Sequence, residues 1–248
     1  MTKDHKNAYM LTQIIITRPY HDAEKLRKLI LKNTCLIPYI CSCIDISPLQ
    51  FKPINSYYDG IIFTSKNAVK YFSDSLNIAS IYAIGSSTAE CIIEKYCRDV
   101  TFPDYRGMGN LIEIFKKIKV KDKKYLIVQG KNGKPELKEA LERMSAVVDT
   151  MDCYERVVPK KLESNFNSLL LNKISKAGKS IIVFTSFEGL RNLWYTLSDH
   201  KYLLSSAITV TSAQMHDWAH EKGFSEIIFL DDISNEGIIG NIQKYMNF

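Results

Sequence analysis

The sequence predicts an α/β protein with two similar Rossmann- or flavodoxin-like lobes, each built on a parallel sheet, joined by a two-stranded connector. Three observations carry this prediction: strands alternate with helices, one strand–turn–helix segment recurs, and two extended segments separate the recurring parts. The 248 residues suffice for one large domain or two ordinary ones, and 46% hydrophobic with 24% charged residues is typical of globular proteins.

Short β-branched runs alternate with segments of helical periodicity along the whole chain. We predict strands at 14–16, 60–63, 81–84, 125–128, 181–184, 208–210 and 226–230. We predict helices at 22–31, 68–75, 88–96, 111–118, 135–144, 189–197, 215–222 and 236–245. Such alternation is typical of parallel sheets with helices on both faces.

An internal repeat divides the chain. The tripeptide Phe-Thr-Ser begins at Phe63 and again at Phe184, and each copy is followed by a small residue, Ala68 or Gly189, then an aliphatic residue and a base. The following units also correspond, while the segment from residue 126 loosely matches the opening segment from residue 14.

The matching segments come in a different order in the two halves of the chain. The segment from residue 14 opens the chain, whereas its counterpart from residue 126 follows the first Phe-Thr-Ser segment. The predicted domain boundaries follow from this order. We expect residues 1–38 and 158–248 to form lobe 1, and residues 41–155 to form lobe 2. The crossings, near 37–46 and 152–158, are extended and can pair as a hinge.

Small polar or basic residues follow most of the predicted strands. They are Thr17-Arg18, Thr64-Ser65-Lys66, Gly85-Ser86-Ser87-Thr88, the segment 129–133, Thr185-Ser186 and Thr211-Ser212. Ligands bind at this end of parallel strands, and helix N-termini there favour carboxylates or phosphates. A net charge of +6 suits an anionic ligand. The alternative is that the hydroxyls are helix N-caps.

Several function classes find no support in the sequence. There is no phosphate-binding loop of the G-x-x-x-x-G-K-[ST] type, and the G-x-G at Gly107 follows no suitable strand. No G-x-S-x-G motif is present. His216 and His220 are spaced as a metal pair, but no third ligand is evident, so we expect no metal and no other cofactor.

Partners and compartment follow from charge and cysteines. The lysine-rich run from Lys116 to Lys124 is either a solvated surface or a binding patch, and no nucleic-acid motif accompanies it. The six cysteines form no C-x-x-C pair, which favours a reduced, cytoplasmic setting. No signal peptide or membrane span is evident, and we expect a monomer without nucleic-acid or membrane partners.

Tyr154 lies in the second crossing, where a hinge strand would face a ligand. A phenol at this position can donate a proton to a departing oxygen. The alternative is an aromatic residue that only packs the hinge.

Several segments together resemble the uroporphyrinogen-III synthase family over nearly the whole chain after Tyr9. They are ITRP at 16–19, LIPY at 36–39, DGIIFTSKNAV at 59–69, YAIGSSTAE at 82–90, GKNGKPELKEAL at 130–141, YERV at 154–157 and VFTSFEGL at 183–190. The order and spacing of these segments are more specific than any one of them.

The resemblance implies two mobile lobes, the linear tetrapyrrole hydroxymethylbilane with its eight carboxylates as substrate, and closure to uroporphyrinogen III without a cofactor. It implies Tyr154 as the candidate acid. Carried over, the substrate-binding positions are Thr64, Ser65, Lys66, Ser86, Ser87, Thr88, Lys131, Asn132, Ser186, Phe187 and Glu188, to which the strand-end argument adds Arg18, Thr211 and Ser212.

One departure from the family and two rival functions remain at this stage. Gln214 stands where Thr88 stands in the other lobe, so a hydroxyl contact there is not expected. The rivals are a non-catalytic binding module for a polycarboxylate and a different transferase or lyase on a similar scaffold, since one fold hosts many functions.

Overall fold

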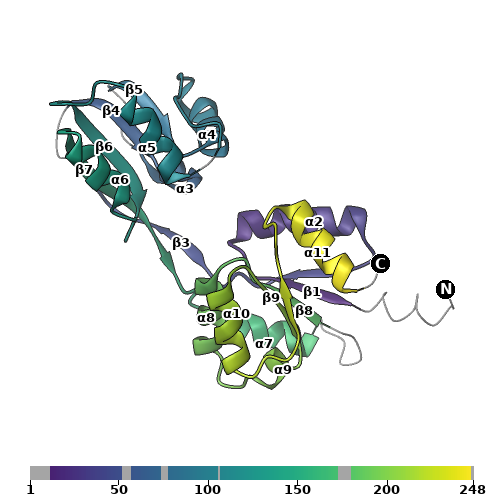
Figure 1. Cartoon of the computed structure of the whole chain (residues 1–248). Coiled ribbons are helices and arrows are strands. Elements are labelled where there is room, and N and C mark those ends of the chain that lie inside the picture. Colours follow the sequence, from purple (N-terminus) through teal and green to yellow (C-terminus); the bar gives the residue numbers. More distant parts are fainter. Residues whose placement is uncertain (1–11, 52–56, 74–77, 106, 173–179, 247–248) are drawn as a thin grey trace. The chain divides into compact units, whose positions relative to one another are not determined.

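The computed structural model describes residues 12–51, 57–73, 78–105, 107–172 and 180–246. The chain forms two compact units (Figure 1). Unit 1 comprises Met1–Asp45 and Val157–Phe248, and unit 2 comprises Ile46–Arg156. Each unit is a mainly parallel sheet covered by helices, so the predicted fold class is confirmed.

The sheet of unit 1 is parallel throughout. Its strands are β1 (Gln13–Ile16), β2 (Ile37–Ile40), β8 (Ser180–Val183), β9 (Ala207–Val210) and β10 (Ile227–Phe229), in the order β10-β9-β8-β1-β2. Every residue of β1, β8 and β9 is buried, as expected for strands that carry helices on both faces.

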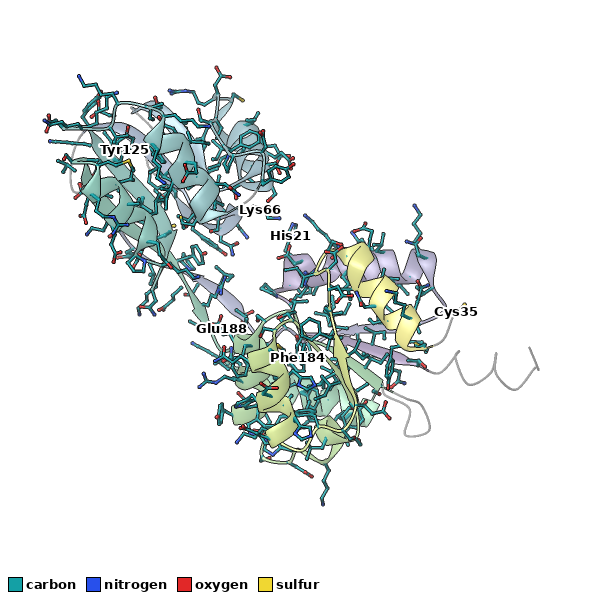
Figure 2. All side chains as sticks on the ribbon, in the orientation of Figure 1. His21, Cys35, Lys66, Tyr125, Phe184 and Glu188 are labelled. Carbon is teal, nitrogen blue, oxygen red and sulfur yellow. The ribbon has the colours of Figure 1, made fainter. Side chains whose placement is uncertain are left out.

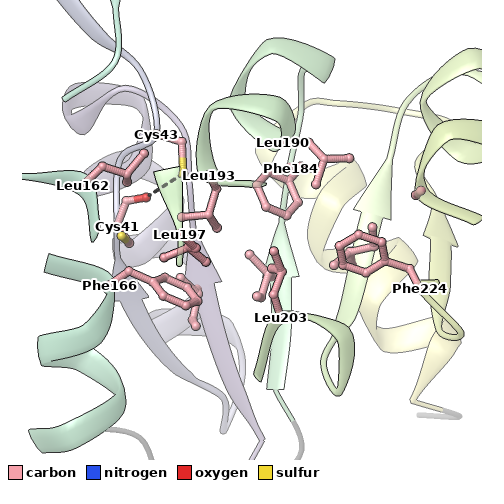
Figure 3. Packing of buried hydrophobic residues seen from close by; sticks show 14 of the residues in the cluster. Cys41, Cys43, Leu162, Phe166, Phe184, Leu190, Leu193, Leu197, Leu203 and Phe224 are labelled. Carbon is pink, nitrogen blue, oxygen red and sulfur yellow. Dashed lines mark hydrogen bonds between the residues drawn. The ribbon is translucent and has the colours of Figure 1, made fainter. Parts of the chain in front are cut away.

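Helices cover both faces of this sheet because successive strand residues point to opposite sides. Ile14 and Ile16 pack with α2 (Tyr20–Asn33) and α11 (Asn235–Tyr245). Ile15 faces the other cluster, part of which Figure 3 shows. The helices of that face are α7 (Leu162–Asn172), α8 (Phe187–Thr196), α9 (Lys201–Leu204) and α10 (Ala213–Glu221).

The sheet of unit 2 has the order β3-β7-β6-β4-β5. Its strands are β3 (Asp45–Pro48), β4 (Tyr58–Phe63), β5 (Ile78–Ala83), β6 (Lys124–Gly130) and β7 (Val147–Val157), and β4 to β7 pair in parallel. One face packs against α3 (Lys66–Tyr71) and α4 (Ser86–Tyr96), and the other against α5 (Met108–Lys116) and α6 (Glu136–Arg143).

The connector consists of β3 and β7, which lie side by side in the sheet of unit 2. Both strands cross a boundary between the units, since β3 begins at Asp45 and β7 ends at Val157. Just past β3, the backbone N–H of Leu49 donates to the carbonyl of Cys153 at 3.0 Å. The expectation of a two-stranded connector is thus met by these two strands.

Residues 41–45, which the sequence analysis assigned to lobe 2, belong to unit 1 instead. The reason is burial: Cys41 and Cys43 are 3% and 0% exposed and lie in the core cluster shown in Figure 3. The preceding residues 37–40, expected as part of a crossing, form β2 and pair with β1.

Two helices of unit 1 were not predicted, α7 and α9. In α7, Leu162, Phe166 and Leu169 are buried at helical spacing, a signal that the Asn- and Ser-rich composition of the segment obscures. The helix predicted at 68–75 ends at Tyr71, and residues 74 and 75 lie outside the described residues. Across the described parts of the chain, no helix is long and apolar enough to cross a membrane.

Candidate active site

Most of the predicted site residues of unit 2 lie along one edge of its sheet. Thr64, Ser65 and Lys66 follow β4, residues 86–88 follow β5, and Lys131 and Asn132 follow β6. Tyr154 lies on β7, opposite the last residue of β6. Because these strands are parallel, their carboxyl ends share one edge, and the structure therefore brings these residues to the same side of unit 2.

A hydrogen bond between side chains joins two of them, Tyr154 and Ser65. The Tyr154 hydroxyl lies 3.0 Å from the Ser65 Oγ, and the same Oγ accepts the backbone N–H of Ala68 at 3.0 Å as the N-cap of α3. With that acceptor role filled, the Ser65 proton can point at the phenol oxygen. The phenol proton is then available to another acceptor, which is the arrangement that a proton donor needs.

Tyr154 itself is held firmly in the structure. Its side chain is 5% exposed, and its ring lies 6.2 Å from that of Tyr71. Its carbonyl accepts the backbone N–H of Lys131 at 2.8 Å. These contacts give both interpretations of Tyr154 from the sequence a structural basis: the ring packs in the core of unit 2, and the hydroxyl is tied to a candidate site residue.

The remaining residues after β4 and β6 differ in how far hydrogen bonds and ion pairs hold their side chains. Thr64 donates its backbone N–H and its hydroxyl to the carbonyl of Val128, at 3.1 and 3.3 Å, whereas Lys66 is exposed (labelled in Figure 2). Lys131 pairs with Glu155 at 2.9 Å across the surface. Asn132 adopts φ 62°, a left-handed conformation that asparagine tolerates and that shapes the turn before α6.

The segment after β5 divides into accessible and buried positions. Gly85 is the N-cap of α4 and has no side chain to satisfy the first N–H groups. Ser86 is exposed and Ser87 half-buried, whereas Thr88 is 3% exposed. An anion at this helix start would therefore meet Ser86 and Ser87, while Thr88 packs inside unit 2.

Arg18 marks the corresponding edge of unit 1. Its guanidinium donates to the Thr185 hydroxyl at 3.2 Å, to Asn235 Oδ1 at 2.8 Å and to the Ile233 carbonyl at 2.6 Å. Burial lowers the pKa of Arg18, and the nearby charge of Asp22 raises it. The three acceptors are neutral, so this positive charge at the carboxyl edge of the sheet is compatible with an anionic ligand.

The other predicted residues of unit 1 occupy the first turns of α8 and α10. Ser186 and Ser212 are the N-caps of these helices, and their hydroxyls accept the N–H of Gly189 and of Met215 at 3.2 Å. Thr211 lies 3.8 Å from the sulfur of Met215. The alternative that strand-end hydroxyls serve as caps is thus correct for Ser65, Ser186 and Ser212.

Phe187 and Glu188 form the first turn of α8, where Figure 2 labels Glu188. The Phe187 ring packs edge-on against Trp218 at 5.5 Å, and the Arg191 guanidinium lies 5.7 Å from the Phe187 ring. Both predicted residues are half-buried. The unit 1 set thus shares the carboxyl edge of one sheet with Arg18, as parallel β1, β8 and β9 require.

Three polar partners in these sites were missed by the sequence analysis. Asn235 binds Arg18, Glu155 binds Lys131, and Asp152 accepts the Gln129 amide at 3.1 Å. Asn235 is 217 residues from Arg18, so no local pattern could have found it. Glu155 adjoins Tyr154 in a segment predicted to be extended, but Lys131 is 24 residues away from it, so no local pattern indicated this pair either.

Neither a metal nor a thiolate is indicated by the geometry. Among the described residues no group of three His, Cys, Asp or Glu side chains could hold a metal ion. Cys153 adjoins Tyr154, and its thiol lies 3.6 Å from the carbonyl of Ala68. Burial raises the pKa of Cys153 to about 11, so this thiol is protonated at neutral pH and is a poor nucleophile.

Comparison with known proteins identifies the family. The model of the family described as uroporphyrinogen-III synthase HemD matches residues 24–239. The chain belongs to the uroporphyrinogen-III synthase family. The resemblance seen in the sequence is therefore confirmed, and the match spans both units and all the predicted site residues except Arg18.

Individual family members are only distantly similar to this chain. It is 28% identical over 160 residues to the uroporphyrinogen-III synthase of Proteus mirabilis, covering 58% of this chain and 80% of that protein. It is 22% identical over 250 residues to the enzyme of Escherichia coli strain K12, covering 93% and 99% of the two chains.

Among solved structures, the uroporphyrinogen-III synthetase of Helicobacter pylori 26695 matches with a TM-score of 0.64 at 16% identity, covering 94% of this chain and 99% of that chain. At this level of identity the match supports the fold alone.

Proposed function

We propose that this chain is a uroporphyrinogen-III synthase that closes hydroxymethylbilane to uroporphyrinogen III with loss of water and inversion of the last pyrrole ring. The observation that carries the proposal is the family match over residues 24–239. The net reaction is redox-neutral and releases only water, so it consumes no oxidant, reductant or second substrate, and we propose that it proceeds without a cofactor.

Tyr154 is the residue we assign to the first proton transfer. The terminal hydroxymethyl group leaves as water when its oxygen takes the phenol proton, so the remaining chain becomes an electron-poor azafulvenium cation and Tyr154 a phenolate. Ser65, 3.0 Å from the phenol oxygen, then donates to the phenolate and stabilises it. Such a positioned acid contributes about 100-fold or more to a rate.

The inversion follows from which carbon of the last ring attacks the electron-poor centre. The substituted carbon of the last ring bonds first to the electron-poor carbon and gives a spiro intermediate. The bond that joined this ring carbon to the methylene bridge of the preceding ring then breaks, and the bridge bonds to the free position of the same ring. The proton released as that pyrrole regains aromaticity returns to Tyr154 and restores the phenol. The protein's main contribution is to hold one folded conformation of the substrate against direct closure.

Carboxylates of the substrate are assigned to the strand ends of both units. The proposed binding residues are Arg18, Thr64, Ser65, Lys66, Ser86, Ser87, Thr88, Lys131, Asn132, Ser186, Phe187, Glu188, Thr211 and Ser212. Exposed Lys66 and Ser86, and the neutral hydrogen-bond acceptors of Arg18, support this assignment best. Buried Thr88 acts through its backbone and packing rather than its hydroxyl.

We further propose that the protein works as a monomer in the cytoplasm, with the tetrapyrrole as its only partner. Six free cysteines support a reducing compartment, since three of them, Cys41, Cys43 and Cys153, are buried as thiols. Size-exclusion chromatography with light scattering tests the monomer, and a mass twice 28.4 kDa would contradict it.

An isomer assay tests the function. Freshly made hydroxymethylbilane is incubated with the protein, the products are oxidised to porphyrins, and the type I and type III isomers are separated by chromatography. We expect type III in large excess over a protein-free control. Type I alone, from folded protein, would refute the synthase and would favour a polycarboxylate-binding module instead.

A further inference from the structure

We propose that Gly130 is a positioning residue for Tyr154: the missing side chain at residue 130 leaves the space in which the phenol lies to reach Ser65. This inference rests on the proposed function for its kinetic part. The contact between the two residues can be tested without any activity.

The close approach of ring and backbone is the first observation. A Cβ placed on Gly130 would lie 2.6 Å from Cζ, 2.8 Å from Cε2 and 2.9 Å from the hydroxyl oxygen of Tyr154. Ordinary contact between such atoms begins near 3.4 Å. Every side chain other than hydrogen at residue 130 therefore overlaps the reactive end of the phenol.

The backbone conformation at residue 130 does not require a glycine. The φ of Gly130 lies outside the left-handed range, unlike that of Gly107 or Gly223, so residue 130 has a conformation that an L-residue can adopt. Gly130 pairs with Tyr154 just after a shift in register between β6 and β7. The irregularity brings Tyr154 rather than Cys153 opposite Gly130, and the demand for glycine is purely steric.

The surroundings determine which group would move. The backbone of Tyr154 is held by the Lys131 N–H at 2.8 Å, and the neighbouring Cys153 thiol lies 3.5 Å from the carbonyl of Gln129. The strand is thus held on both sides of the contact, and an added methyl group displaces the ring instead. A displaced ring loses the 3.0 Å contact between the Tyr154 hydroxyl and Ser65.

Two other glycines of unit 2 provide a contrast. Gly133 also leaves no room for a Cβ, but its neighbour is the side chain of Gln129, which is not part of the reactive pair. Gly109 in α5 has nothing within 4 Å of its ideal Cβ. Gly109→Ala is therefore a matched control, since it adds the same methyl group without a contact.

The kinetic test is a cycle of Gly130→Ala, Tyr154→Phe and their double variant, with type III formation as the readout. Gly130→Ala should lower kcat by about 10- to 100-fold with KM changed less than about threefold, because the acid is misplaced while the binding residues remain. In the Tyr154→Phe background the same substitution should leave kcat unchanged, since no hydroxyl remains to misplace. Gly109→Ala should match the unsubstituted protein.

The second test uses thermal unfolding and needs no activity. Gly130→Ala should lower Tm by about 5 °C, the cost of overpacking a buried contact. In the Tyr154→Leu background the ring is gone, and Gly130→Ala should shift Tm by less than about 1 °C. If Gly130→Ala alone does not fold, the double variant with Tyr154→Leu should fold.

The outcomes separate the two claims. A kcat for Gly130→Ala equal to that of the unsubstituted protein, or an undiminished loss in the Tyr154→Phe background, would overturn the positioning role. An equal Tm shift in both backgrounds would overturn the contact. A chain that makes no type III isomer at all would refute the proposed function, while the unfolding cycle would still decide whether Gly130 and Tyr154 compete for the same space.

Discussion

Unit 1 and unit 2 use the same strand–turn–helix segment, yet its N-cap serine has different neighbours in each. In unit 2, Ser65 caps α3 and lies 3.0 Å from the Tyr154 hydroxyl. In unit 1, Ser186 caps α8 through Gly189, and a Cβ on Gly189 would meet Ser186 Oγ at 3.3 Å and Ile44 Cδ1 at 3.7 Å.

The difference shows what the duplicated segment supplies and what it does not. Both copies provide a capped helix N-terminus at the carboxyl edge of a parallel sheet, which suits anion binding. The proposed proton donor, Tyr154, lies outside the repeated segment, on β7. On the proposed function, each unit therefore offers its own positions for substrate carboxylates, and the proposed acid belongs to unit 2.

The largest expected effect is the loss of the Tyr154 hydroxyl. Tyr154→Phe should lower kcat for type III formation by about 100-fold without abolishing it, since substrate folding and the bound charges remain. The measurement is the steady-state rate with the isomer ratio. Tyr58→Phe is a matched control. It removes a hydroxyl that donates a hydrogen bond to Asp149 Oδ2, 2.9 Å away, and should leave kcat unchanged. An unchanged kcat for Tyr154→Phe would leave Tyr154 as a packing residue only.

Substitution of Ser65 and Ser186, the N-cap serines of the two units, should have smaller effects that differ between the units. Ser65→Ala and Ser186→Ala each remove a helix cap, at a cost of about 1 kcal/mol in the free energy of unfolding. Ser65→Ala should also lower kcat by about 10-fold, because it removes the donor to the phenolate. Ser186→Ala should instead raise KM with kcat within about twofold. Steady-state kinetics and urea unfolding check both variants, and identical kinetic changes would contradict the division of roles.

The smallest effect concerns the thiols that both crossings bury. Burial raises the pKa of Cys41 to about 12 and that of Cys153 to about 11. Above about pH 9 the folded protein keeps these thiol protons while the unfolded chain releases them. The free energy of unfolding is therefore independent of these thiols well below pH 9 and falls as the pH rises above it. At pH 9.5 the raised pKa of Cys41 lowers the free energy of unfolding by about 0.8 kcal/mol.

Urea unfolding at pH 8 and pH 9.5 measures this loss. Cys41→Ala should flatten the alkaline decline relative to the unsubstituted protein, and Cys153→Ala should do so in unit 2. Cys35→Ala, at an exposed cysteine, is the control and should leave the decline unchanged. A decline that all three variants share would assign the alkaline loss to other groups.

Sequence patterns predicted the parts of the fold that local periodicity determines. The repeat around Phe63 and Phe184 predicted two related units, and both Ser65 and Ser186 are caps as the alternative anticipated. The boundary near residue 41 was wrong because the buried Cys41 and Cys43 continue the core of unit 1, and an extended segment looks alike on either side of a boundary.

The candidate site was predictable as a set of strand ends but not as contacts. Tyr154 and Ser65 are 89 residues apart, and their hydrogen bond depends on the register shift between β6 and β7. The three acceptors of Arg18 come from elements that only the folded sheet of unit 1 brings together. Such contacts are products of tertiary packing, and no periodic pattern encodes them.

The measurement that tests the central claim most directly is the kcat cycle of Tyr154→Phe, Ser65→Ala and the double variant for type III formation. If Ser65 acts through Tyr154, the double variant should be no slower than Tyr154→Phe alone, because the serine has no phenolate left to stabilise. Losses that multiply, with the double variant slower by the product of the two single effects, would contradict a single reactive pair in unit 2.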